Sequence, residues 1–188
     1  MILDAFETLY DRRPPAWLRK VEVRELARVF SEAFDVEPPE LASLSADEAL
    51  AAFREFTAAC MEAALADGEL SARYRERLGQ GAFGLGSQVR QMLGVRKGNA
   101  FRVTRFFYRG IGIELSGEMP GRVRFGPCSF SQRYTPADCW FMSAFDEGFM
   151  RGLSGQEGVD LVFTCRLTEG APFCLAGFGL ESDRGETS

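Results

Sequence analysis

The sequence contains no histidine, and this absence excludes much of the usual chemistry of enzymes. Without an imidazole the chain cannot form a His-based catalytic triad or a His-ligated zinc site, so acid–base chemistry must come from Asp, Glu, Cys, Lys or Tyr. No C-x-x-C pair is present, so the five cysteines lack the short chelate of zinc ribbons and ferredoxins. We therefore expect no metal and no cofactor, while a soft-metal site made of widely spaced cysteines stays open.

A block of basic residues and a long apolar segment are also lacking. With 22 basic and 27 acidic residues the net charge is −5, which disfavours nucleic acid and anionic membranes as partners. The apolar runs are far shorter than the roughly 18 residues that cross a bilayer. The start, MILDAFETLYDRR, is acidic where a signal peptide is basic, and an odd number of cysteines favours reduced thiols. We expect a cytoplasmic protein with a small-molecule partner, and leave a homodimer open.

The remaining composition is typical of one globular domain. The 188 residues are 46% hydrophobic and 26% charged, as in soluble folded proteins. We expect a single domain over residues 1–188. Its parts are a helical region at 1–109, a β-β-α-β-β region at 110–181 and a frayed tail at 182–188.

The first region has the periodicity of helices. Residues Val21–Phe34 place apolar side chains on one face. Ser45, followed three residues later by Glu48, predicts a capping box at the start of the next helix. Two further helices are expected, one ending at Gly79 and one at Gly94, before an apolar helix over residues 99–110.

The run GQGAFG, residues 79–84, matches the G-x-G-x-x-G pattern of dinucleotide-binding proteins. That fingerprint requires a preceding strand, a following helix and an acidic residue about twenty positions later. Here the preceding sequence is helical, and residues 97–105 are basic or neutral. We interpret the run as a turn between two helices.

After Gly110 the pattern alternates and predicts two hairpins. The first pairs Ile111–Leu115 with Arg122–Phe125, and the second pairs residues 159–167 with 172–180 around the turn at 168–170. The order along the chain indicates an α+β fold, with a helical N-terminal half packed on a four-stranded antiparallel sheet in β-β-α-β-β order.

A helix is predicted between the two hairpins. Thr135 is a favoured N-cap residue, and Pro136 and Asp138 suit the first turn that follows. We expect this helix to run to about Gly152, with core-facing residues Trp140, Phe141, Ala144, Phe145 and Phe149.

Cys139 is the leading candidate for chemistry. It lies at the fourth position of the capped helix, where the positive end of the helix dipole would lower the thiol pKa and favour thiolate. Ser143 and Asp146 follow one and two turns later and would share a face with it, distinct from the stripe of Trp140 and Phe145. The alternative is that Cys139 is a small buried apolar residue and Asp146 is solvated.

Further candidates come from the hairpins. Arg166 is suited to an anionic group through its planar fork of donors, or to an internal carboxylate such as Glu169. Cys128 and Cys174 would converge with Cys139 if both hairpins share one sheet. Cys60 and Cys165 are expected to belong to the core, which leaves the other three cysteines for a site.

The C-terminal half resembles the L-2-amino-thiazoline-4-carboxylic acid hydrolase-like family. Over residues 78–180 the shared features are a Cys after a strand, a second Cys that opens a helix, an Asp-x-Gly near the end of that helix and a T-x-G-x-x-x-C hairpin. These features correspond to Cys128, Cys139, Asp146 with Gly148, and Thr168, Gly170 and Cys174. The same ending is similar to small-molecule-binding domains of the 4-vinyl reductase type.

These resemblances imply two functions of different classes. The first is hydrolysis of a C–N bond in a small heterocyclic carboxylate. In that reaction Cys139 would be the nucleophile, Asp146 or Glu169 the acid or base, and Arg166 the anchor of the substrate carboxylate, with Cys128, Ser143, Tyr134 and Cys174 lining the site. The second is a non-catalytic binding domain, in which cysteines pack or bind metal and aromatic residues line an apolar pocket. The pocket residues would be Phe106, Phe107, Tyr108, Phe125, Phe130 and Tyr134.

Overall fold

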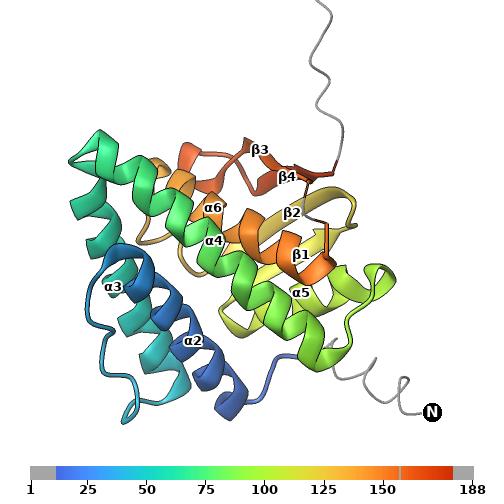
Figure 1. Ribbon diagram of the computed structural model, residues 1–188, viewed down its shortest axis with the longest axis horizontal. Helices are drawn as coiled ribbons and strands as arrows, with labels where there is room; N and C mark the ends of the chain where they lie inside the picture. Colours follow the sequence, from blue (N-terminus) through green and yellow to red (C-terminus); the bar gives the residue numbers. More distant parts are fainter. Residues whose placement is uncertain (1–11, 157, 180–188) are drawn as a thin grey trace, which may run out of the picture.

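The computed structural model describes residues 12–156 and 158–179, and its helical part comes first along the chain (Figure 1). Its elements are α2 (Ala16–Phe34), α3 (Ala46–Leu65), α4 (Gly68–Leu93), the 3-10 turn η1 (Lys97–Asn99) and α5 (Ala100–Gly110). As expected, Ser45 and Glu48 form the capping box of α3, and Gly94 ends α4 in the left-handed conformation. The tail predicted for residues 182–188 lies outside the described residues.

The second part of the chain forms one antiparallel sheet around a further helix. Its elements are β1 (Ile113–Gly117), β2 (Gly121–Cys128), α6 (Pro136–Ser154), β3 (Leu161–Cys165), the 3-10 turn η2 (Leu167–Glu169) and β4 (Cys174–Phe178). The α+β class and the four-stranded antiparallel sheet are confirmed. The spatial order β1-β2-β4-β3 differs from the order along the chain, because β4 lies between β2 and β3.

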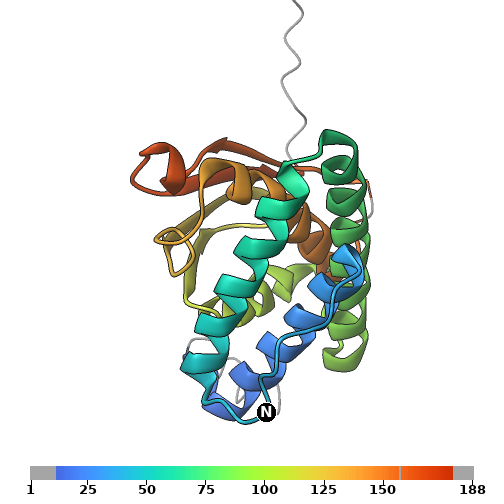
Figure 2. The same cartoon turned by 90° about the vertical axis from the view of Figure 1, so that its left-hand side faces the viewer.

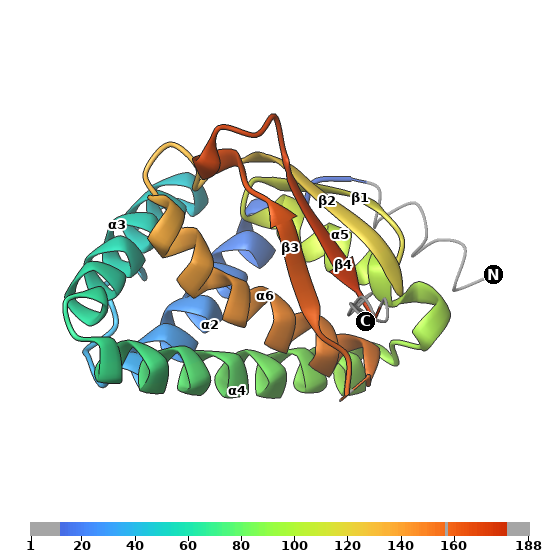
Figure 3. The same ribbon diagram turned by 90° about the horizontal axis from the view of Figure 1, so that it is seen from above.

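Helix α6 lies between the sheet and α4 (Figures 2 and 3). It contacts α4 most extensively and also contacts α3, α5, β3 and η2, while α5 packs under β1. As predicted, the helix starts after Thr135, whose hydroxyl accepts the Asp138 N–H at 3.2 Å while the Asp138 carboxylate accepts the Thr135 N–H at 2.8 Å. This cap fixes where α6 begins and so which of its residues face the sheet.

The predicted break at Gly79 is wrong, because α4 continues through the whole GQGAFG run. The glycines serve packing instead. A Cβ on Gly86 would lie 2.3 Å from the Phe149 carbonyl oxygen, and one on Gly148 would lie 2.2 Å from that of Gly79. The two helix backbones therefore touch where side chains would hold them apart. The turn interpretation also fails, and a run in the middle of a helix cannot wrap around a phosphate group.

The prediction for the core face of α6 is correct except for one residue. Phe141, Ala144, Phe145 and Phe149 are buried, but Trp140 is 42% exposed. The guanidinium of Arg75 on α4 stacks over the indole ring at 4.6 Å. Helical spacing alone did not distinguish the core face from the edge where α4 crosses.

Two glycines of α4 provide a direct test of the helix contact. We expect Gly86→Ala to lower the free energy of unfolding by about 2 to 3 kcal/mol, because the new methyl group overlaps the backbone of α6. At Gly84 an added Cβ meets nothing within 4 Å, so Gly84→Ala should raise stability by about 0.5–1 kcal/mol through helix propensity. Urea unfolding of both variants measures the difference, and equal effects would contradict the close contact.

Candidate functional site

A cavity of about 70 Å³ lies where α2, α3, α5 and α6 meet the sheet. About half of its lining residues are aromatic: Phe30, Phe53, Tyr108, Phe125, Phe130, Tyr134, Phe145 and Phe163. Three thiols, Cys128, Cys139 and Cys174, complete much of the remaining wall. Among the described lining residues, Asp146 and Arg166 carry the formal charges. A mainly apolar cavity with a few converging polar groups is the usual form of a small-molecule site.

Most of the residues selected from the sequence come together at this cavity. Cys128 ends β2, Cys174 begins β4, and Cys139 and Asp146 lie on α6, while Arg166 follows β3. Tyr134 also lines the cavity, and its hydroxyl forms a 2.5 Å hydrogen bond with that of Thr57 on α3. Ser143 and Glu169 do not line it.

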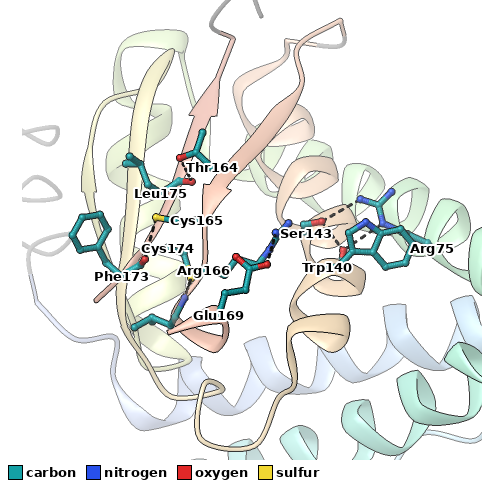
Figure 4. A network of polar contacts seen from close by, with 11 residues as sticks. Arg75, Trp140, Ser143, Thr164, Cys165, Arg166, Glu169, Phe173, Cys174 and Leu175 are labelled. Carbon is teal, nitrogen blue, oxygen red and sulfur yellow. Dashed lines mark hydrogen bonds and ion pairs between the residues drawn. The ribbon is translucent and has the colours of Figure 1, made fainter. Parts of the chain in front are cut away.

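Ser143 faces α4 instead of the cavity. Its hydroxyl donates to the Trp140 carbonyl at 2.6 Å and accepts from Arg75 at 3.1 Å (Figure 4). At about 100° per residue, Asp146 lies almost directly below Cys139, whereas Ser143 is rotated by about 40° to the other side. Phe145, which the sequence places on a separate face, lies about 120° from Cys139 on the same side as Asp146. It lines the same cavity because the cavity extends around that side of the helix.

Glu169 lies at the surface of η2 and contacts the site only through Arg166. The Arg166 guanidinium donates to its carboxylate at 3.3 Å (Figure 4), and the Glu169 side chain is 44% exposed. The same guanidinium lies 5.1 Å from the ring centre of Phe163. Glu169 thus positions the arginine, and the acid–base role considered for it has no geometric support.

Arg166 reaches the cavity because strand β3 is irregular. Strict alternation would place it with Val162 and Thr164, which are exposed on the outer face. The pairing register between β3 and β4 shifts between Phe163 and Cys165. A bulge of this kind turns the following side chain toward the other face. The Nε atom of Arg166 is buried and has no hydrogen-bond partner among the described residues.

The expected activation of Cys139 by the helix start is wrong. Burial raises the pKa of the Cys139 thiol to about 11, and the nearby Thr168 hydroxyl opposes only part of the rise. Burial likewise raises the pKa of Cys128 to about 12 and shifts that of Cys174 upward. The cost of placing a thiolate in an apolar wall therefore exceeds the opposing effects of the Thr168 hydroxyl and the Arg166 charge.

The cysteines do not form a recognisable metal site. Among residues 12–156 and 158–179, no group of three or more Cys, Asp or Glu side chains is arranged to hold a metal ion. Cys60 is partly buried on α3, and the Cys165 thiol points to the Phe173 carbonyl at 3.5 Å. The alternative of a soft-metal centre gains no support from this geometry.

Asp146 is the most perturbed acid of the cavity. Burial raises its pKa to about 7, although a hydrogen bond from the Tyr108 hydroxyl at 2.6 Å and the positive charge of Arg166 both oppose the rise. The group therefore exchanges a proton near neutral pH, as functional carboxyls often do. Tyr108 had been selected only as an aromatic wall residue, because no local sequence signal pairs it with an acid 38 positions later.

Comparisons with models of protein families, with curated proteins and with solved structures find no match to this chain. Within the described part of the chain, none of the helices is both long and apolar enough to cross a membrane.

The raised pKa of Asp146 makes stability depend on pH. The folded state holds the Asp146 proton more tightly than the unfolded chain does. The contribution of this group to the free energy of unfolding is therefore complete below about pH 4 and is lost as the pH rises through about 7. The shift from 3.8 to about 7 corresponds to about 4 kcal/mol. We expect Asp146→Asn to remove most of this loss, so that the variant is the more stable protein at about pH 8.

Urea unfolding at a series of pH values measures this effect. Asp160→Asn, at an exposed position, is the control and should keep the pH profile of the unmodified protein. Parallel profiles for Asp146→Asn and the unmodified protein would show that Asp146 does not carry the raised pKa.

Proposed function

We propose that the chain binds a small carboxylate with an apolar body in the cavity between α6 and the sheet. The observation that carries this proposal is the guanidinium of Arg166, which enters an aromatic cavity with its buried Nε lacking a partner among the described residues. A buried donor without an acceptor is costly, and a ligand oxygen would satisfy it. Arginine is also the side chain best suited to bind a carboxylate with two parallel hydrogen bonds.

The surroundings of Arg166 support a role in binding. Glu169 holds one terminal nitrogen from the solvent side and the Phe163 ring lies against the guanidinium plane, so the fork has a defined direction. Little side-chain freedom remains to be lost when a ligand binds, which favours affinity.

Asp146 accommodates an anionic ligand because of its proton. An ionised carboxylate beside Arg166 would compete with the ligand, but a pKa of about 7 leaves much of Asp146 neutral at physiological pH. The protonated form can donate a hydrogen bond to the ligand while its Oδ1 atom still accepts from Tyr108. Binding of an anion then raises the pKa of Asp146 further, so affinity falls as the pH rises above about 7.

The cavity volume limits the size of the ligand. A single water needs about 10–15 Å³ on this measure, so 70 Å³ accommodates roughly five water-sized groups. The aromatic and thiol walls favour an apolar or sulfur-containing body. Short aliphatic carboxylates such as propionate, with five heavy atoms, fit this description best, and a five-membered-ring carboxylate would require the walls to move apart.

Arginine substitutions test the binding proposal. We expect Arg166→Met to weaken binding of propionate by about tenfold or more, because one charged hydrogen bond is worth about 1.5–3 kcal/mol. Isothermal titration calorimetry at about pH 6 measures the affinity. Arg124→Met is a matched control, since Arg124 also stacks on an aromatic ring, that of Phe173 at 4.1 Å, but does not line the cavity. Unchanged affinity in Arg166→Met, or equal losses in both variants, would contradict the proposal.

Hydrolysis of a C–N bond in such a carboxylate is a second candidate, favoured by one observation. Asp146, with a pKa of about 7, and Cys139 line the same cavity. A thiol with a pKa of about 11 needs a base. As sulfur attacks an amidine carbon, the thiol proton would pass to Asp146 and then to the departing nitrogen as the C–N bond breaks. Water would next break the C–S bond and restore the thiol.

A direct assay separates turnover from binding. With 2-amino-thiazoline-4-carboxylate as substrate, hydrolysis should be lost in both Cys139→Ser and Asp146→Asn and retained in Cys60→Ser. Turnover that survives Cys139→Ser would exclude this mechanism. Binding without any turnover would leave the carboxylate-binding function alone.

A further inference from the structure

A second concave site lies on the opposite side of Tyr108 from the cavity. It is a groove of about 490 Å³ between α2, the C-terminal half of α4 and α5. This volume is within the range of about 300–1,000 Å³ that is typical of small-molecule sites. Its walls are largely aliphatic and aromatic, and Leu18, Leu85, Val89, Met92 and Phe107 contribute to them. Met92 is 75% exposed at its edge.

Two carboxyl groups, those of Glu22 and Glu25, enter this apolar groove, and the described lining residues include no Lys or Arg. Glu25 accepts a hydrogen bond from Arg28 at 2.9 Å, so its charge is already paired. Glu22 differs, because its Oε2 atom is buried and has no hydrogen-bond partner among the described residues. A buried carboxyl oxygen without a hydrogen-bond donor destabilises the folded state unless a ligand supplies that donor.

The fold makes room for the Glu22 carboxyl and leaves its Oε2 atom without a hydrogen-bond partner among the described residues. A Cβ on Gly110, the last residue of α5, would lie 2.1 Å from Oε2, so only glycine admits the carboxyl at this place. Arg19, whose positive charge acts on Glu22, forms its hydrogen bonds with other groups. It donates to the Gly110 carbonyl at 2.9 Å and to Asp47 at 2.5 Å. Arg19 thus acts on Glu22 only through space.

We propose that the groove binds a primary ammonium group carried on an apolar chain, with Glu22 as its counter-ion. The ammonium would give Oε2 the donor that it lacks, and the apolar chain would cover the wall formed by α4 and α5. An anionic ligand would meet two carboxyls and no Lys or Arg among the described lining residues, and an uncharged one would leave the ionised carboxylate without a counter-ion. This site is distinct from the carboxylate cavity and has the opposite charge preference.

The charges around Glu22 predict how binding depends on pH. Burial raises the pKa of Glu22, and the nearby Arg19 lowers it in part. The other titratable groups that face it are Glu25 on the same helix and Tyr108 on α5, with Asp47 behind Arg19. An ammonium ligand stabilises the ionised carboxylate, so binding releases a proton. Affinity should therefore rise with pH until Glu22 is ionised in the free protein.

Calorimetric titration of the full chain with n-hexylammonium, n-hexanol and n-hexanoate tests this inference. We expect n-hexylammonium to bind about tenfold more tightly than n-hexanol. The binding of n-hexanoate is measured in Arg166→Met, where the carboxylate cavity has lost its anchor, and should there be the weakest of the three. Glu22→Gln should abolish the preference for the ammonium, while Glu25→Gln, which changes the paired carboxylate, should keep it. Arg166→Met should also keep it, which separates this site from the carboxylate cavity.

Equal affinities for n-hexylammonium and n-hexanol would overturn the proposal. So would an ammonium preference that persists in Glu22→Gln while circular dichroism shows a native fold. If Glu22→Gln does not fold, the comparison of n-hexylammonium with n-hexanol on the unmodified protein still decides the question. Leu85→Trp, which fills the groove from α4, should then weaken the binding of all three ligands. Unchanged affinity for n-hexylammonium in that variant would show that the amine binds outside the groove.

Discussion

The close contact between α4 and α6 is the constraint on which the rest of the structure depends. Glycines of both helices, including Gly86 and Gly148, let the two backbones meet without intervening side chains. This contact fixes the depth and rotation of α6 between the helices and the sheet (Figure 3). Since Cys139 and Asp146 lie on α6, the same contact determines that both residues face the cavity and not α4.

Burial dominates the electrostatics of both concave sites. In the cavity it outweighs the Thr168 hydroxyl and Arg166 at Cys139, and it outweighs both Arg166 and the Tyr108 hydroxyl at Asp146. In the groove it outweighs Arg19 at Glu22. Each carboxyl therefore holds a proton more strongly than it would in water, and a ligand of suitable charge or hydrogen-bonding capacity can change that balance.

Tyr108 links the two sites physically. Its hydroxyl donates to Asp146 on the cavity side, and its pKa is raised by burial first, then by Asp146 and, to a smaller extent, by Glu22. Leu26, Ile111 and Phe145 also line both spaces. A side chain that moves when one site is occupied would alter the wall of the other, because packed interiors have little free volume to absorb the change.

The sequence by itself determined the local features: the capped starts of α3 and α6, the two hairpins, the α+β class and the short list of thiols and charged groups from which a site could be built. These depend on residues close together in the chain, such as Thr135 with Asp138. Only the tertiary structure decided the rest. Helix α4 continues through Gly79 because its glycines pack directly against the backbone of α6. Ser143 faces α4 and not the cavity. The tertiary structure also turned Arg166 inward through a shift of register and raised the pKa of Cys139 instead of lowering it, because register and burial arise from contacts between segments that are distant in sequence.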